Sequence, residues 1–207
     1  MRGRDESDND VVNAYSLALA REGFTKREED YYTITLSEDV LGWVGLDRAR
    51  RGPRRAVLEI DIGVGLRNQP LEQLVAELKE VEYHDYFPPS IGMNIGYLMP
   101  KQIYTPWLFD NQTDIAAAVL QGMADLRKYA FPFMRSNIQL KKLLNTLWKC
   151  EHVGWDYCIP AALYLLKDYR KIPRFLAEEI TRREYWTERV DQPYRDFASR
   201  LLQRLPK

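Results

Sequence analysis

Apolar residues occupy every second position in a central segment of the chain. From Ala56 to Leu66 every even-numbered residue is apolar, and Glu59 and Asp61 stand at odd positions between them. Because successive side chains of a strand point to opposite faces of its sheet, this alternation predicts a long strand with one buried face. The opposite face is predicted to be polar and to carry both carboxylates.

Alternation of the same kind marks three other segments as strands, at residues 31–36, 40–46 and 91–97. The first three strands of the chain follow one another through short links, which favours an antiparallel meander. Residues 70–78 interrupt the series with the 3.6-residue period of a short helix that Pro70 opens. The segment 91–97 then adds a fourth strand.

Helical periodicity dominates the two ends of the chain. A first helix is expected over residues 11–22, with Gly23 as its C-terminal cap. In the second half of the chain, Asn111 is expected to cap one helix, and Ser136 to open the next through a capping box with Gln139. Three more helices are expected at 157–169, 173–189 and 193–205.

These elements predict an α+β fold, in which an antiparallel sheet of about four strands is backed by helices and followed by a C-terminal helical bundle. Two domains are expected, an α+β domain over residues 10–145 and a helical extension over residues 146–207. Pro and Gly are sparse between residues 130 and 160, so the extension is expected to pack on the first domain rather than hang from a linker.

Several short motifs follow one another in a recognisable order. They are an N-terminal helix, Gly23-Phe24, the aromatic strand Tyr31–Leu36, the strand ending at Ile62–Gly65, Trp107, an amphipathic helix and Phe131-Pro132-Phe133. Over roughly residues 10–145 this order resembles a bacterial domain family catalogued as the domain of unknown function numbered 4304. The resemblance implies an α+β fold and a bacterial origin, and it implies no catalytic residues.

The composition of the chain indicates its cellular compartment and the class of partner that it can bind. The 207 residues include 30 basic and 30 acidic side chains, so the chain as a whole lacks the positive charge expected of a dedicated nucleic-acid binder. The first residues lack the apolar segment of a secretory signal, and only two cysteines are present. No apolar run approaches the ~18 residues that a membrane span needs. A cytoplasmic protein without membrane attachment is therefore expected.

Five arginines lie within eight residues between the second and third predicted strands, at positions Arg48, Arg50, Arg51, Arg54 and Arg55. Gly52-Pro53 between them predicts a turn, so the guanidinium groups would project from the end of a hairpin. Such groups can bind an acidic protein surface or the phosphates of a nucleic acid. A solvated turn that protects the strand edges is the other interpretation.

The polar face of the third strand is a second candidate surface. Glu59 and Asp61 could line a polar concavity with Asn94 from the fourth strand and Tyr31 from the first. Oxygen ligands in this arrangement could hold a divalent cation, and ordinary cross-strand salt bridges are the alternative. Gly63 follows on this face, so the additional acid that a metal-dependent nuclease would need is not found there.

Two further segments contain residues that are common in catalytic sites. His84 and Asp85 are adjacent in an expected loop, where a histidine oriented by a carboxylate could act as a general base, but no nucleophile is identified beside it. Cys150 and Cys158 flank His152 in a spacing that is atypical of zinc sites. A helix junction with buried thiols is the favoured interpretation.

The sequence therefore predicts no catalytic residue, no cofactor and no metal ion. The favoured function is non-catalytic binding of another protein, for example neutralisation in an immunity or defence role, which rests on analogy with small bacterial α+β proteins. Two alternatives stay open. One is a metal-assisted hydrolase that uses Glu59 and Asp61, and the other is a nucleic-acid accessory protein that grips phosphates through Arg48–Arg55.

Overall fold

The computed structural model describes residues 4–28, 30–53, 56–149, 155–186 and 192–206. The chain forms two compact units. Unit 1 contains residues Met1–Leu66 and Gly92–Ser136, and unit 2 contains residues Arg67–Ile91 and Asn137–Lys207. The units are interleaved along the chain. The division into a domain over residues 10–145 and an extension over residues 146–207 that packs on it stays a prediction.

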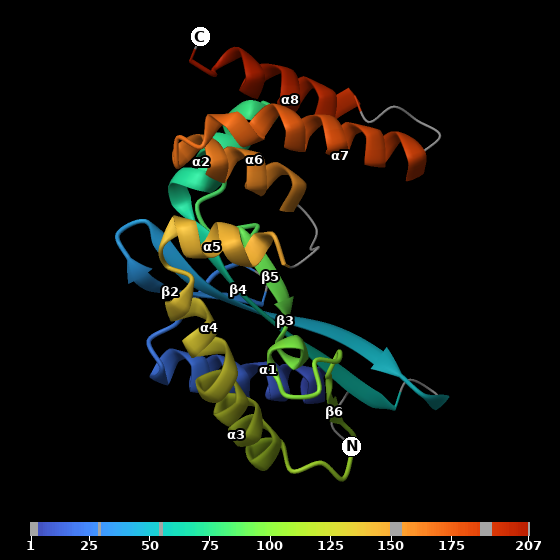
Figure 1. Ribbon diagram of the computed structural model, residues 1–207. Helices are drawn as coiled ribbons and strands as arrows, with labels where there is room; N and C mark the ends of the chain where they lie inside the picture. The colour runs from blue at the N-terminus through green and yellow to red at the C-terminus, as the bar shows by residue number, and fades with distance from the viewer. Residues whose placement is uncertain (1–3, 29, 54–55, 150–154, 187–191, 207) are drawn as a thin grey trace. The chain divides into compact units, whose positions relative to one another are not determined.

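Unit 1 is built on the antiparallel sheet (Figure 1). Its strands are β1 (Thr25–Lys26), β2 (Tyr31–Ser37), β3 (Val40–Arg51), β4 (Val57–Asn68), β5 (Ile91–Asn94) and β6 (Trp107–Phe109). Its helical elements are α1 (Arg4–Arg21), the 3₁₀ turn η2 (Ile95–Leu98), α3 (Ile115–Asp125), the π-helical turn η3 (Leu126–Ala130) and α4 (Phe131–Ser136). The last two residues of β4 and the first of β5 belong to unit 2.

The order of the sheet confirms the predicted α+β class. Strands β1 to β5 lie side by side in chain order, and β6 pairs antiparallel with the first part of β4. The sheet of the described residues therefore has six strands instead of about four. The two additional strands, β1 and β6, contain two and three residues. Segments of this length are too short for an alternating pattern to be recognised.

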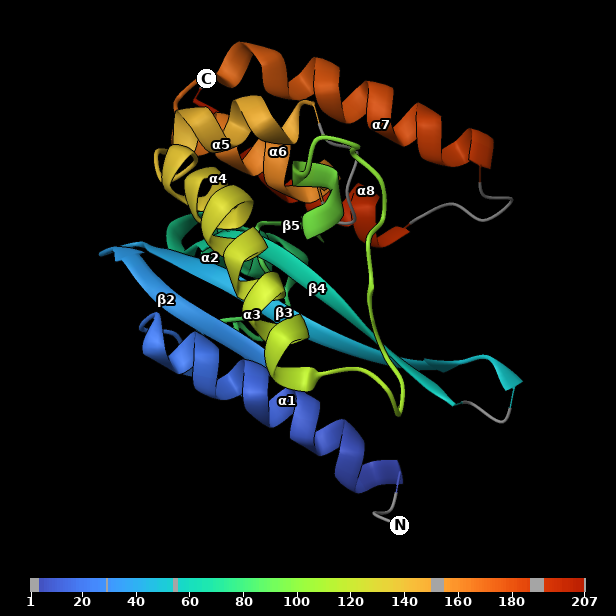
Figure 2. The ribbon, with the colours of Figure 1, turned by 90° about the horizontal axis from the view of Figure 1, so that it is seen from below.

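One face of the sheet in unit 1 is covered by α1, α3 and α4 (Figure 1 and Figure 2). The Tyr15 ring of α1 packs edge-on against Phe109 of β6, with centroids 6.4 Å apart, and Phe24 stacks on Phe131 at 5.7 Å. Ile60 and the other even-numbered apolar residues of β4 are buried, as predicted. The helices therefore cover the even-numbered face, and the carboxylates Glu59 and Asp61 lie on the other.

Two helix caps differ from the prediction. Asp114, not Asn111, caps α3, and its side chain accepts a hydrogen bond of 3.1 Å from the Ala117 amide. Asn111 lies in the preceding turn, where Asp110 organises the backbone through its own side-chain hydrogen bonds. Ser136 is the last residue of α4 and donates to the Phe133 carbonyl, so it opens no capping box.

Unit 2 consists mainly of helices. They are α2 (Gln69–Lys79), α5 (Leu140–Leu147), α6 (Trp155–Leu165), the 3₁₀ turn η4 (Tyr169–Lys171), α7 (Ile172–Trp186) and α8 (Gln192–Gln203). Asn68 caps α2, and the apolar side of α2 is buried among α6 and α8. The Arg200 guanidinium of α8 donates to the Leu78 carbonyl at the end of α2. These contacts explain why α2 groups with the C-terminal helices rather than with the sheet.

None of the helices in the described part of the chain is long and apolar enough to cross a membrane.

Candidate functional site

Glu59 is the centre of a hydrogen-bonded group on the polar face of unit 1. Its side chain is only 3% exposed and forms an ion pair with Arg51, whose Nη2 lies 2.9 Å from Glu59 Oε1. The Tyr104 hydroxyl donates a second hydrogen bond of 2.9 Å to the same oxygen. Partial burial of the hydroxyl and its bond to Glu59 raise the pKa of Tyr104 to about 12, so the phenol stays a hydrogen-bond donor at neutral pH.

Asp61 and Asn94 form a separate pair. Asn94 Nδ2 lies 2.5 Å from Asp61 Oδ1, and Asn94 Oδ1 accepts from the backbone amides of Gly96 and Thr105. Asn94 thereby caps η2 and holds the segment that follows it against β4. Its role in this arrangement is structural.

Tyr31 of β2 has an aromatic neighbour. Its ring packs against Trp43 with centroids 5.2 Å apart. The Trp43 indole lies over Gly45 and Gly63, so an aromatic side chain covers the part of this face that has no acidic residue. Of the four residues that the sequence grouped, Asp61 and Asn94 are hydrogen-bonded to each other, Glu59 accepts from Arg51 and Tyr104, and Tyr31 packs against Trp43.

This face offers little for a metal-assisted reaction. The described residues contain no group of three or more His, Cys, Asp or Glu side chains that could hold a metal ion. The Glu59 oxygens accept from Arg51 and Tyr104, and Asp61 accepts from Asn94. These carboxylates act as acceptors for neighbouring side chains.

The three described arginines of the hairpin are each held by a carboxylate. Arg48 Nη2 lies 2.9 Å from Asp30, Arg50 pairs with Asp8 of α1, and Arg51 pairs with Glu59. Because strand residues alternate, Arg51 lies on the Glu59 face and the two even-numbered arginines lie on the face covered by α1. Arg54 and Arg55 lie outside the described residues.

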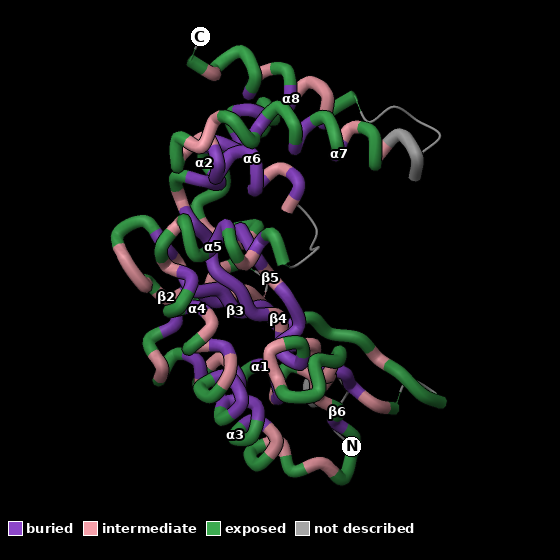
Figure 3. Tube along the Cα trace, viewed as in Figure 1, coloured by how far each residue is buried: buried purple, intermediate pink, exposed green. Residues whose placement is uncertain are grey.

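Exposed apolar side chains lie beside Arg51. Leu108 of β6 pairs with Glu59 in the sheet, so its side chain points to the same face. Leu108 is 56% exposed and Tyr104 is 41% exposed. Tyr97 and Ile103 extend this group, since the segment that carries them folds around Asn94. We call Arg51, Tyr97, Ile103, Tyr104 and Leu108 the β6 surface. Figure 3 shows exposed residues at the end of the β3–β4 hairpin and near β6.

Unit 2 contains a cavity of about 780 Å³ between α2, the segment 81–90, α6 and α7. This size is typical of small-molecule sites. At the end of β4 the buried Arg67 donates to the backbone carbonyls of His84 and Pro88, and its Nε lies 3.0 Å from Gln69 Oε1. Arg67 thereby holds the segment 81–90 in the shape that forms one wall.

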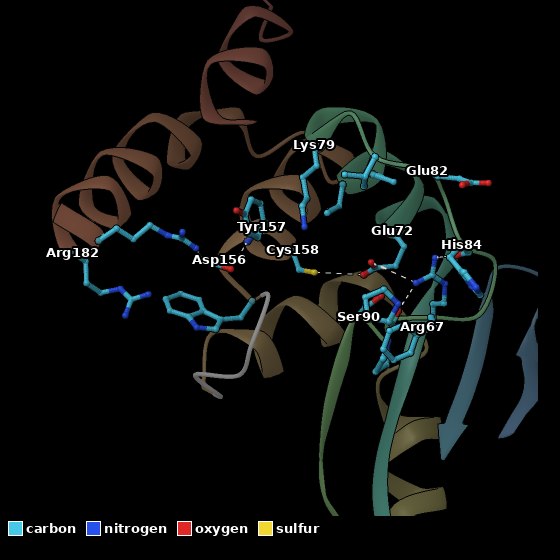
Figure 4. A pocket seen from close by; sticks show the side chains of 18 residues that line it. Arg67, Glu72, Lys79, Glu82, His84, Ser90, Asp156, Tyr157, Cys158 and Arg182 are labelled. Atoms are coloured by element: carbon cyan, nitrogen blue, oxygen red, sulfur yellow. Dashed lines mark hydrogen bonds and ion pairs between the residues drawn. The ribbon is translucent and has the colours of Figure 1, made fainter. Parts of the chain in front are cut away.

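Glu72 and Cys158 form the base of the cavity (Figure 4). Arg67 Nη1 lies 3.6 Å from Glu72 Oε2, and the Cys158 thiol donates to Glu72 Oε1 at 3.5 Å. Burial raises the pKa of Glu72, although Ser90, Arg67, Cys158 and Lys79 oppose the change. Burial and the Glu72 carboxylate raise the pKa of Cys158. The thiol is therefore protonated, although Lys79 and Arg67 oppose the change.

Cationic and aromatic side chains form the opposite wall. Lys79 Nζ lies 4.5 Å from the centre of the Tyr157 ring, and the Arg182 guanidinium lies 5.2 Å from that of Trp155. Arg183 packs over Tyr157 and pairs with Asp156. Both arginines also pair with Glu179.

The predicted pair His84 and Asp85 lies on the segment 81–90. Both side chains are exposed, and His84 Nδ1 lies 3.8 Å from Asp85 Oδ1. His84 lines the cavity, but Arg67 and Glu72 lie between it and the thiol of Cys158 (Figure 4). Cys158 is buried, as expected, while Cys150 and His152 lie outside the described residues.

Sequence reasoning did not identify this cavity. One signal was present: Glu72, Val75, Ala76 and Lys79 recur at the i, i+3, i+4 and i+7 positions of one face of α2, and all four line the cavity. Glu72 and Lys79 place a charge at each end of this face, whereas the neighbouring face of α2 is purely apolar.

Comparison of the chain with protein-family models, with curated proteins and with solved structures finds no match. The resemblance to the domain family numbered 4304 stays a prediction.

Proposed function

We propose that this chain is a non-catalytic binding protein that recognises another protein through the β6 surface. The observation that carries the proposal is the position of Arg51 beside exposed Tyr104 and Leu108. Aromatic residues and arginine are enriched at protein interfaces, where a few of them supply most of the binding free energy. A neutralising or immunity-type role is one form that such binding could take.

Arg51 is prepared for an interface. Its side chain remains 65% exposed although Glu59 fixes the guanidinium. A side chain that is already ordered loses less conformational entropy when a partner binds. The sequence carries two further arginines, Arg54 and Arg55, shortly after Arg51, which add positive charge to this part of the chain. The complementary partner is a protein with an apolar patch bordered by acidic residues.

The alternatives have less support from the geometry. For a hydrolase, Glu59 and Asp61 would need to be available to a metal ion, and both accept hydrogen bonds from neighbouring side chains. For a nucleic-acid protein, Arg48 and Arg50 would need to reach phosphates, and both form ion pairs within unit 1. Neither alternative uses the exposed apolar residues of the β6 surface.

A crosslinking experiment followed by a binding measurement tests the proposal. A photoreactive amino acid is placed at Leu108 in cells, and at Leu202, an exposed leucine of unit 2, as the control. We expect one protein to be crosslinked from position 108 and not from 202. That protein is then purified, and its affinity is measured for the unmodified chain, Leu108→Asp and the control Leu17→Asp.

The expected result is a loss of at least about tenfold in affinity for Leu108→Asp alone, since the charge must be desolvated at an apolar contact. The affinity of the unmodified chain should also fall as salt is raised. Equal affinities for the two aspartate variants would contradict the proposal. A crosslink to nucleic acid instead of protein would favour the phosphate-binding alternative.

A further inference from the structure

We propose that the cavity of unit 2 binds a small organic carboxylate that carries a flat, apolar body. This inference concerns a site separate from the β6 surface and does not depend on the proposed protein-binding function. Three features of the cavity carry it: its pattern of charge pairing, its aromatic wall and its size.

The pairing of charged residues in the cavity favours a ligand with a single negative charge. Arg67 pairs with Glu72, Arg183 pairs with Asp156, and Arg182 pairs with Glu179. Lys79 differs, because no salt bridge of the described residues includes it: its Nζ approaches the Tyr157 ring, and its charge acts on Glu72 and Cys158 without a direct ion pair. One cation that forms no direct ion pair among these residues matches a carboxylate. A phosphate dianion would need more donors than one ammonium group supplies.

The position of Lys79 suits this role. Its side chain reaches from the last turn of α2 toward Tyr157 and Cys158 (Figure 4). A ligand carboxylate beside Nζ could form a charge-assisted hydrogen bond while the ammonium stays near the ring. Because Glu72 is bonded to Arg67 and Cys158 deeper in the cavity, it is already supplied with partners.

The remaining wall suits a flat, apolar body. Val75 and Ala76 of α2 line one side, and Phe87 and Pro89 of the segment 81–90 line another. Trp155 adds an aromatic surface from α6. Aromatic and apolar walls with a few fixed polar groups are typical of small-molecule sites, where the polar groups set the orientation of the ligand.

An NMR titration of the full-length, ¹⁵N-labelled chain tests the proposal with two probes of the same shape. 2-Naphthoate carries the carboxylate, and 2-naphthalenemethanol is its neutral counterpart. We expect 2-naphthoate to bind saturably with a Kd of about 1 mM or tighter, as expected for a ligand of this size. The largest shifts should fall on α2, α6 and the segment 81–90.

Four variants locate the site. Lys79→Met should weaken naphthoate binding about tenfold or more and leave naphthalenemethanol unaffected, whereas Lys79→Arg should retain naphthoate binding. Lys142→Met, an exposed lysine of α5, is the matched control and should change neither affinity. Val81→Trp adds an indole at an exposed position of the cavity wall and should weaken both probes.

Any of three results would overturn the inference. One is the absence of saturable binding of 2-naphthoate by the unmodified chain. Another is equal naphthoate affinity of the unmodified chain and Lys79→Met. Retention of both probes by Val81→Trp would equally exclude the cavity as the site. The β6 surface is untouched by these variants, so the two proposals fail or succeed separately.

Discussion

The Tyr194 hydroxyl donates a 3.2 Å hydrogen bond to the backbone carbonyl of Asp156. That carbonyl is the one that Pro160 leaves without a helical donor, because proline at position i has no N–H to offer to residue i−4. A side chain of α8 therefore completes the hydrogen bonding of α6. This contact explains how α6 tolerates a proline inside its apolar run.

Tyr194→Phe should lower the free energy of unfolding by about 1–3 kcal/mol, because the buried Asp156 carbonyl then lacks this donor. In a Pro160→Ala background the same change should cost less, since the new amide can donate to the carbonyl. Urea denaturation of the four proteins gives the coupling directly. Additive effects of the two substitutions would show that the carbonyl does not depend on Tyr194.

The Arg51–Glu59 pair should contribute to stability although Arg51 is mostly exposed. The buried Glu59 carboxylate accepts from Arg51 and Tyr104, and Arg51→Gln removes the first of these partners. We therefore expect the free energy of unfolding to fall by about 1–2 kcal/mol. This is below the range for fully buried pairs because solvent screens the arginine. The double variant Arg51→Gln with Glu59→Gln should recover part of the loss in chemical denaturation. If the double variant recovers no stability, the charge of Glu59 is not the cause of the loss.

Glu72 should make unit 2 less stable as the pH rises. Its folded-state pKa is raised above the ordinary value of 4.5, so the folded state holds the proton more tightly than the unfolded state does. The resulting stabilisation is complete below pH 4.5 and is lost as the pH rises through the folded-state pKa. Glu72→Gln should remove this decline.

The measurement is the free energy of unfolding between pH 4.5 and pH 8 for the unmodified chain and for Glu72→Gln. Glu82→Gln is the matched control, since Glu82 lines the same cavity but is exposed. It should follow the pH dependence of the unmodified chain. Parallel curves for all three proteins would contradict the assignment to Glu72.

Gly45 should tolerate a methyl group less well than Gly63 does. A Cβ atom at Gly45 would lie 2.5 Å from Cη2 of Trp43, whereas one at Gly63 would lie 3.3 Å from Cζ3. Moving a packed indole costs about 1–3 kcal/mol, so Gly45→Ala should lower the melting temperature and shift the Trp43 indole resonance. Gly63→Ala should do both to a smaller extent. A larger effect of Gly63→Ala than of Gly45→Ala would mean that the Trp43 indole does not lie closest to Gly45.

The two proposed sites differ in how much of each could be read from the sequence. The arginine-rich turn is a local pattern, and it drew attention to one end of the β3–β4 hairpin. The apolar residues that complete the β6 surface are 38 to 49 residues further along than Glu59, and their places in the sequence gave no sign of this neighbourhood. Sequence reasoning therefore found the arginines but not the surface around Arg51.

The sequence by itself determined the longer strands and helices and the fold class, because alternation in β4 and the 3.6-residue period of the helices are local consequences of backbone geometry. It also determined which face of β4 is buried. Only the tertiary structure decided the partners of the polar residues. Glu72 and Cys158 are 86 residues apart, and a contact of this separation depends on how α2 and α6 pack. The cavity follows from that packing, so no local pattern could specify it.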